Sequence, residues 1–283
     1  MFRLLLPFLF LLVLNAGVLA QSSIQKPGTK SASVQVLSDS FYMPQLKTFR
    51  KIWIYLPAGY TTTNKRYPVI YMQDAQNLFD EATAFSGEWG VDETLDSLAA
   101  SGGQELIVVG IENGGNERLN EYAPWKNAQY GGGKGEAFAA FLADTLKPFV
   151  DRHYRTKRQA KYTAVAGSSM GGLISLYTGL KYPEKFGYMG IFSPSIWFAK
   201  RDLMYFVNSN RNKLRHSRMY IVAGKNESAE MQADIAELTN LLLQKGINPK
   251  NIRTKIDAYG VHNEAYWRGE FPAAVTWFLE SKR

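Results

Sequence analysis

Tyr162-Thr-Ala-Val-Ala-Gly-Ser-Ser-Met-Gly-Gly172 is an apolar run that ends in a Gly-x-Ser-x-Gly pattern. Apolar residues then recur at helical spacing, namely Leu173, Ile174, Leu176 and Tyr177. A strand, a tight glycine turn and a helix in this order are typical of a nucleophile elbow, with a serine at its apex. The hydroxyl of Ser169 would stand near a helix N-terminus, whose N–H groups favour negative charge. The pattern predicts that Ser169 is a nucleophile; the alternative is a serine that only shapes the turn.

The rest of the chain alternates between strand-like and helix-like segments. Continuous apolar runs predict buried strands at 67–72, 106–111, 188–192 and 219–223, with further strands at 34–37, 50–56 and 252–256. Periodic apolar positions predict helices at 91–98, 136–150, 202–208, 229–245 and 273–279. This alternation predicts an α/β fold with a mostly parallel sheet and helices on both faces. We expect one domain over residues 34–283.

The first 33 residues differ from this pattern. Arg3 is followed by an apolar run over 4–14 and by small residues at Val18 and Ala20, which is the layout of a signal peptide cleaved after residue 20. Residues 21–33 are polar with Pro and Gly, and they predict a flexible tether. No second apolar stretch of about 20 residues follows. We expect an exported protein without a stable membrane span; the alternative is an uncleaved anchor.

Composition excludes several kinds of site. The chain has no cysteine, which rules out disulfides, thiolate nucleophiles and cysteine-based zinc sites. An exported protein without disulfides fits a bacterial envelope, so we expect it to be periplasmic or secreted. The net charge is +8, but the basic residues are scattered and no aromatic stripe is interleaved with them. We therefore expect a solvated basic surface and no nucleic-acid partner.

A serine nucleophile needs a base within hydrogen-bond reach, and the chain has only three histidines. His153 and His216 lie in basic segments that are typical of a surface. His262 follows the last predicted strand, near the edge of the sheet where open α/β sheets bind their ligands. The order serine, acid, histidine is also that of α/β-hydrolases. We predict that His262 is the base; the alternative is a helix-capping histidine.

The acid that orients His262 should follow a strand after Ser169. Glu227, just beyond the strand at 219–223, fits this position best. Asp257 is closer to His262 in the sequence and is the alternative acid. The remaining alternative is a Ser–His pair that works without a third residue.

The oxyanion of an acyl-transfer reaction needs two backbone N–H groups. One follows the nucleophile and belongs to Met170. The other should come from the loop at 74–77, where Ala75 or Gln76 could donate, and we favour Gln76. Asp74 precedes the nucleophile in the chain, and we expect it to brace this loop.

Aromatic residues on loops are candidates for the walls of a substrate pocket. Those expected at the carboxyl edge of the sheet are Trp197, Trp125, Tyr122 and Phe79. They could contact an aryl or sugar group, or they could simply pack loop on loop. Arg118 could meet an anionic substrate or pair with Glu121.

Five blocks of sequence, in this order, resemble the Putative esterase family of α/β-hydrolases. They are Tyr55-Leu-Pro-Ala-Gly-Tyr60, Tyr67-Pro-Val-Ile-Tyr-Met-Gln-Asp-Ala-Gln-Asn-Leu-Phe79, Gly167-Ser-Ser-Met-Gly-Gly172, Phe192-Ser-Pro-Ser-Ile-Trp197 and His262-Asn-Glu264. That family includes enterochelin (siderophore) esterases, feruloyl and acetyl-xylan esterases, S-formylglutathione hydrolases and mycolyltransferases. The resemblance implies an α/β-hydrolase fold with Ser169, Glu227 and His262 as nucleophile, acid and base. The chain departs from many relatives at Ala75, where they have glycine.

Together these features predict an exported serine carboxylester hydrolase with a Ser-His-Glu triad that works through an acyl-enzyme. The expected substrate is a small-molecule or saccharide ester of the siderophore, feruloyl or acetyl-sugar type. The reaction needs no metal and no organic cofactor, and we predict no metal site and no particular oligomeric state. One alternative is acyl transfer on the same triad. The other is a non-catalytic binding module that keeps the fold.

Overall fold

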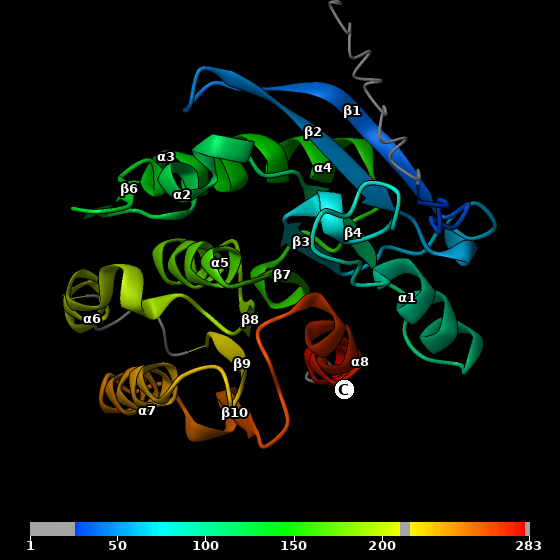
Figure 1. Ribbon diagram of the computed structural model, residues 1–283. Coiled ribbons are helices and arrows are strands. Elements are labelled where there is room, and N and C mark those ends of the chain that lie inside the picture. The colour runs from blue at the N-terminus through cyan, green and yellow to red at the C-terminus, as the bar shows by residue number, and fades with distance from the viewer. Residues whose placement is uncertain (1–25, 210–215, 281–283) are drawn as a thin grey trace, which may run out of the picture.

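The computed structural model describes residues 26–209 and 216–280, so the predicted signal peptide and the first part of the tether lie outside the described residues (Figure 1). An eight-stranded sheet runs through the middle of the molecule. In spatial order its strands are β1 (Val34–Met43), β2 (Thr48–Tyr55), β4 (Ile107–Ile111), β3 (Val69–Gln73), β7 (Thr163–Ser168), β8 (Tyr188–Phe192), β9 (Arg218–Gly224) and β10 (Ile252–Asp257). The pairs β1–β2 and β2–β4 are antiparallel and the other five are parallel.

Helices cover both faces of the sheet, which confirms the predicted α/β architecture (Figure 1). They are α1 (Val91–Ala100), α2 (Arg118–Tyr122), α3 (Gly135–Ala140), α4 (Lys147–His153), α5 (Met170–Lys181), α6 (Lys200–Ser209), α7 (Ala229–Gln244) and α8 (Glu264–Glu280). A π-helical segment, Phe141–Leu146, joins α3 to α4, so the predicted helix at 136–150 is one continuous helical run. The polar segment between β4 and α3 carries α2 and a short hairpin of β5 (Lys126–Asn127) and β6 (Gly131–Gly132).

The core consists of two layers, one on each face of the sheet. Alternate residues of β3 enter different layers: Val69 and Tyr71 pack with α3, α5 and α7, whereas Ile70 and Met72 pack with α1 and α8. Such alternation follows from the period of two of an extended strand. Because both faces are covered, every residue of β3, β4, β7 and β8 is buried. These strands therefore form a rigid platform for the loops at their ends.

Helix α8 differs from the prediction, and so does the tether. Helix α8 begins at Glu264, well before the predicted start, because Asn263 caps it: Asn263 Oδ1 accepts from the Tyr266 N–H at 2.9 Å. Pro272 lies inside this helix, although proline usually ends one.

The described end of the predicted tether, residues 26–31, is held against the body of the protein. The Thr29 N–H donates to Asp80 Oδ1 at 3.1 Å, and the Ser31 N–H donates to Asp92 Oδ2 at 2.7 Å. Side-chain partners on a folded loop thus anchor a segment whose composition alone is typical of a linker. Among the described residues, no helix is both long and apolar enough to cross a membrane.

Candidate active site

The loops that follow the parallel strands meet at one edge of the sheet and carry the predicted site residues. Asp74 follows β3, Ser169 follows β7 and Ser193 follows β8. Glu227 and His262 lie in the loops after β9 and β10. Since the carboxyl ends of parallel strands share an edge, residues that are distant in sequence come together here.

Ser169 sits on a strained turn between β7 and α5. Its φ of 57° and ψ of −122° lie in a region that L residues rarely adopt. A Cβ on Gly167 would lie 2.8 Å from the carbonyl carbon of Gly171, and one on Gly171 would lie 3.0 Å from Asp74 Oδ2. A side chain at Gly167 would therefore clash with the backbone, and one at Gly171 would require Asp74 to move. The turn has the geometry that was predicted for a nucleophile elbow.

His262 and Glu227 form a short hydrogen bond between their loops. His262 Nδ1 lies 2.6 Å from Glu227 Oε2, and the carboxylate side chain is only 2% exposed. The other carboxylate oxygen, Oε1, accepts from the Gly224 N–H at 2.6 Å and from Ser193 Oγ at 2.7 Å. Burial alone would raise the pKa of Glu227, but the hydrogen bonds that it accepts outweigh burial and lower its pKa. The group facing His262 Nδ1 at neutral pH is therefore an anion.

Asp257, the alternative acid, has other partners. Its carboxylate lies 3.0 Å from Lys255 Nζ and accepts from the Tyr259 N–H at 2.9 Å. It thus closes the turn after β10. The carboxylate that contacts His262 is Glu227.

Ser193 and Trp267 support this pair, and the sequence analysis did not single out either of them. Trp267 Nε1–H donates to Ser193 Oγ at 2.8 Å, so Ser193 both accepts from the indole and donates to Glu227. The Trp267 ring also packs edge to face with the imidazole of His262, at a centroid distance of 5.0 Å. The sequence signals for Ser193 are its position directly after a predicted strand and its place in the block Phe192-Ser-Pro-Ser-Ile-Trp197.

Ser169 and His262 line the same cavity but are not bonded to each other directly. In the described part of the chain, the recorded hydrogen-bond partner of Ser169 Oγ is Ser195 Oγ, at 3.2 Å. Bonds between nucleophile and base are often loose without substrate and tighten in the reactive complex.

The cavity has a volume of about 380 Å³, which lies in the range of small-molecule sites. Its lining comprises Asp74, Asn77, Phe85, Ser86, Trp89, Arg118, Ser168, Ser169, His262, Asn263, Glu264 and Trp267. Aromatic rings and charged groups therefore share the space in front of Ser169. Burial raises the pKa of Glu264, which accepts a hydrogen bond from Asn77 Nδ2 at 3.1 Å.

A helix and a short 3₁₀ helix begin beside Ser169. Met170 is the first residue of α5, and Ala75 is the first residue of the 3₁₀ helix η2 (Ala75–Asn77) that follows β3. The first N–H groups of a helix have no acceptor within it. Because β3 and β7 are parallel neighbours, these helix starts lie at the ends of adjacent strands. The N–H groups of Met170, Ala75 and Gln76 are thus available near the elbow.

Comparison with known proteins places this geometry in a family. The family model described as "Putative esterase" matches residues 44–278. The chain belongs to this esterase family. This match confirms the family that the five sequence blocks predicted.

Sequence alignments with known relatives cover from less than half to most of this chain. "Uncharacterized protein YbbA" of Bacillus subtilis is 27% identical over 83% of this chain and 94% of the relative. The "Endo-1,4-beta-xylanase/feruloyl esterase" of Xylanibacter ruminicola is 33% identical over 50% of this chain and 19% of its own length. The "Iron(III) enterobactin esterase" of Escherichia coli K12 is 31% identical over 45% of this chain and 30% of the relative. The last two are much longer than the region they share with the esterase.

Solved structures share its fold. A ferulic acid esterase superposes with a TM-score of 0.68 at 18% identity, covering 88% of this chain and 99% of that one. The enterobactin esterase of Shigella flexneri superposes with a TM-score of 0.71 at 22% identity, covering 90% of this chain and 61% of that one. These likenesses confirm the α/β-hydrolase fold, and family membership makes the chain a carboxylesterase-like hydrolase.

In the esterase, Asp74 braces the loop that holds η2. Its carboxylate accepts a two-pronged pair from Arg118, with Nε–Oδ1 at 2.7 Å and Nη2–Oδ2 at 2.8 Å. Asn113 Nδ2 donates to the same carboxylate at 2.8 Å, and the Asp74 N–H donates to Tyr122 Oη at 3.3 Å. Arg118 therefore pairs with Asp74. Glu121, one of the two alternatives for Arg118, binds Arg50 instead at 2.7 Å.

The predicted aromatic walls of the esterase lie elsewhere. Tyr122 is fully buried in the core. Trp125 packs edge to face against Tyr177, and Trp197, 51% exposed, packs against Tyr130. None of these three belongs to the lining of the cavity. These rings pack against other residues of the protein. Phe79 is also buried, at 1% exposed.

The aromatic lining comes instead from Phe85, Trp89 and Trp267. Phe85 and Trp89 lie in the loop before α1, and Phe85 is 67% exposed. Two aromatic residues four positions apart, just before the predicted helix at 91–98, are a signal that sequence reasoning could have used.

Proposed function

We propose that this protein is an exported serine carboxylester hydrolase that uses a Ser169–His262–Glu227 triad through an acyl-enzyme. The observation that carries the proposal is the 2.6 Å bond between His262 Nδ1 and Glu227 Oε2, because His262 lines the same cavity as Ser169 on its strained turn. A buried carboxylate that holds one imidazole nitrogen leaves the other nitrogen free to act as a base.

In the first half of the reaction, Ser169 Oγ attacks the ester carbonyl while His262 Nε2 takes its proton. Glu227 holds the protonated imidazole through Nδ1–H. The backbone N–H groups of Met170 and Gln76 donate to the oxyanion. His262 then gives the proton to the leaving alcohol oxygen as the ester bond breaks, which leaves an acyl group on Ser169.

In the second half, water replaces the alcohol. His262 takes a proton from water as its oxygen attacks the acyl carbon. Collapse of the second oxyanion intermediate releases the carboxylic acid and returns the proton to Ser169 Oγ. Every proton is restored, so the cycle needs no cofactor.

The cavity favours an ester that carries an aryl or sugar ring. Phe85, Trp89 and Trp267 supply aromatic rings to its lining, and the Arg118–Asp74 ion pair adds polar groups. Feruloyl and enterobactin esterases among the relatives support this class of substrate. Residues 1–20, with a basic start and an apolar run, support export to the periplasm or the medium.

The proposed activity predicts hydrolysis across a short panel of esters. The purified mature protein is incubated with p-nitrophenyl acetate, methyl ferulate and an acetylated xylo-oligosaccharide, and release of free acid is measured. We expect turnover of at least one member, with aryl or sugar esters preferred over the simple acetate. Turnover of none, or acyl transfer to an added alcohol without release of acid, would contradict hydrolysis as the function.

A further inference from the structure

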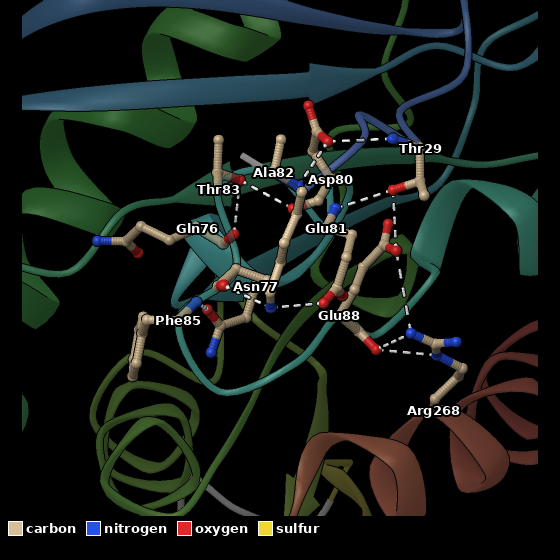
Figure 2. Close-up of polar contacts among 12 residues, drawn as sticks. Thr29, Gln76, Asn77, Asp80, Glu81, Ala82, Thr83, Phe85, Glu88 and Arg268 are labelled. Carbon is tan, nitrogen blue, oxygen red and sulfur yellow. Dashed lines mark hydrogen bonds and ion pairs between the residues drawn. The ribbon is translucent and has the colours of Figure 1, made fainter. Parts of the chain in front are cut away.

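A second polar cluster lies outside the cavity, where the loop before α1 meets the segment that precedes β1. Figure 2 shows one of its members, Glu88, with Thr29 and Arg268. Glu88 belongs to the loop, and Asp92 and Glu93 belong to the first turn of α1. Thr29 Oγ1 donates to Glu88 Oε2 at 2.9 Å, and the Ser31 N–H donates to Asp92 Oδ2 at 2.7 Å. The cluster thus joins three parts of the chain.

Several oxygen atoms in this cluster are buried without a partner. Glu88 is 5% exposed and Asp92 is fully buried, yet Glu88 Oε1 and Asp92 Oδ1 have no hydrogen-bond donor among the described residues. Ser31 Oγ is likewise buried and unpaired. Burying carboxylate oxygens costs free energy unless a cation or a donor compensates for the lost water.

The positive charge of Arg268 pairs with one carboxylate of the cluster, that of Glu88. Arg268 Nη2 lies 3.9 Å from Glu88 Oε2, the oxygen that already accepts from Thr29. Arg268 also donates to the backbone carbonyl of Glu88 through Nε at 2.8 Å (Figure 2). The unpaired oxygens of Glu88 and Asp92 are not part of these contacts.

The geometry of the cluster fits a single ion. Glu88, Asp92 and Glu93 each offer one carboxylate oxygen, and these three atoms all lie within 4.8 Å of one another. Since Ca–O distances are 2.3–2.6 Å, two oxygens on one calcium ion can lie up to roughly 5 Å apart. An all-oxygen set without imidazole or thiolate is the donor chemistry of a hard cation.

We propose that Glu88, Asp92 and Glu93 bind a calcium ion. Calcium accepts six to eight oxygens in flexible geometry, and here water could complete the shell because Glu93 is exposed. Magnesium demands near-ideal octahedral geometry and is usually bound through only one or two carboxylates, so three carboxylates suit calcium better. The ion would tie the loop before α1 to the first turn of α1, and the segment before β1 contacts both through Thr29 and Ser31. It would also stiffen the loop that carries Trp89, the residue after Glu88 and part of the cavity wall.

Calcium titration of the metal-free mature protein tests this proposal. The protein is stripped with a chelator, desalted, and titrated with CaCl₂ by calorimetry and by thermal unfolding. We expect one site with a Kd on the order of 10⁻⁴–10⁻³ M, the range of extracellular calcium modules. At about 10 mM Ca²⁺, Tm should rise by roughly 3–11 °C across this Kd range, with a smaller rise for Mg²⁺.

A pair of variants assigns the binding to these residues. Glu93→Gln removes an exposed carboxylate, so the fold should survive, and we expect Ca²⁺ affinity to fall at least about tenfold. The matched control is Glu81→Gln, which removes a carboxylate of the adjoining turn that pairs with Lys26 and should leave affinity unchanged. Absence of saturable Ca²⁺ binding, equal affinity in Glu93→Gln, or binding of Mg²⁺ alone would overturn the proposal.

Discussion

Replacing Ser169 with alanine is expected to lower kcat for ester hydrolysis about 10⁵- to 10⁶-fold, because the acyl-enzyme can then no longer form. The residual rate would come from substrate binding and the oxyanion donors alone. The measurement is steady-state hydrolysis of the best ester in the panel, with the thermal unfolding of the variant as a check on its fold.

Ser195→Ala is the matched control for this experiment. Its hydroxyl lies 3.2 Å from that of Ser169, so both variants remove the same hydrogen bond while only one removes the nucleophile. We expect Ser195→Ala to change kcat by less than about tenfold. A loss in Ser195→Ala that equals the loss in Ser169→Ala, or more than a few per cent of activity left in Ser169→Ala, would refute the assigned nucleophile.

Glu227→Gln is expected to lower kcat about 10³- to 10⁴-fold with little change in KM. An amide can present its NH₂ group to His262 Nδ1 and favour the wrong tautomer, and it no longer stabilises the imidazolium. The variant keeps the size of the side chain and an oxygen that can accept from Gly224 and Ser193. Loss of activity without unfolding would therefore report on the pairing with His262.

Asp257→Asn separates the two acids. Because Asp257 contacts Lys255 and the Tyr259 N–H, its amide variant should retain activity within about twofold. If Asp257→Asn abolishes turnover while Glu227→Gln does not, the acid has been assigned to the wrong residue.

The framework of the site could be predicted because it depends on chain order. In a parallel sheet every strand ends at the same edge, so the residues after the strands at 163–168, 219–223 and 252–256 had to meet there. The choice between Glu227 and Asp257 depended on loop contacts instead. A Cβ on Gly224 would overlap the backbone of Gly260, so these two glycines let the loops after β9 and β10 touch. This close contact between the two loops brings Glu227 to His262. It depends on both loops, so the sequence of one loop does not predict it.

The pocket walls could not be predicted in the same way. Tyr122, Trp125 and Trp197 have the residue types of a substrate wall, but whether a loop aromatic faces a cavity or the core depends on packing between distant segments. Trp267 was missed as a wall because the predicted helix began only after Pro272. The cap at Asn263 extends α8 toward the sheet edge and places the indole under His262.

The central claim is that Ser169 is the activated nucleophile of this esterase. The most direct test treats the mature protein with a fluorophosphonate, which forms a stable bond only with an activated serine, and locates the adduct by mass spectrometry of peptides. We predict one adduct per chain, on Ser169, and none in His262→Ala over the same time. No adduct in the wild type, or an adduct on Ser195, would contradict the account.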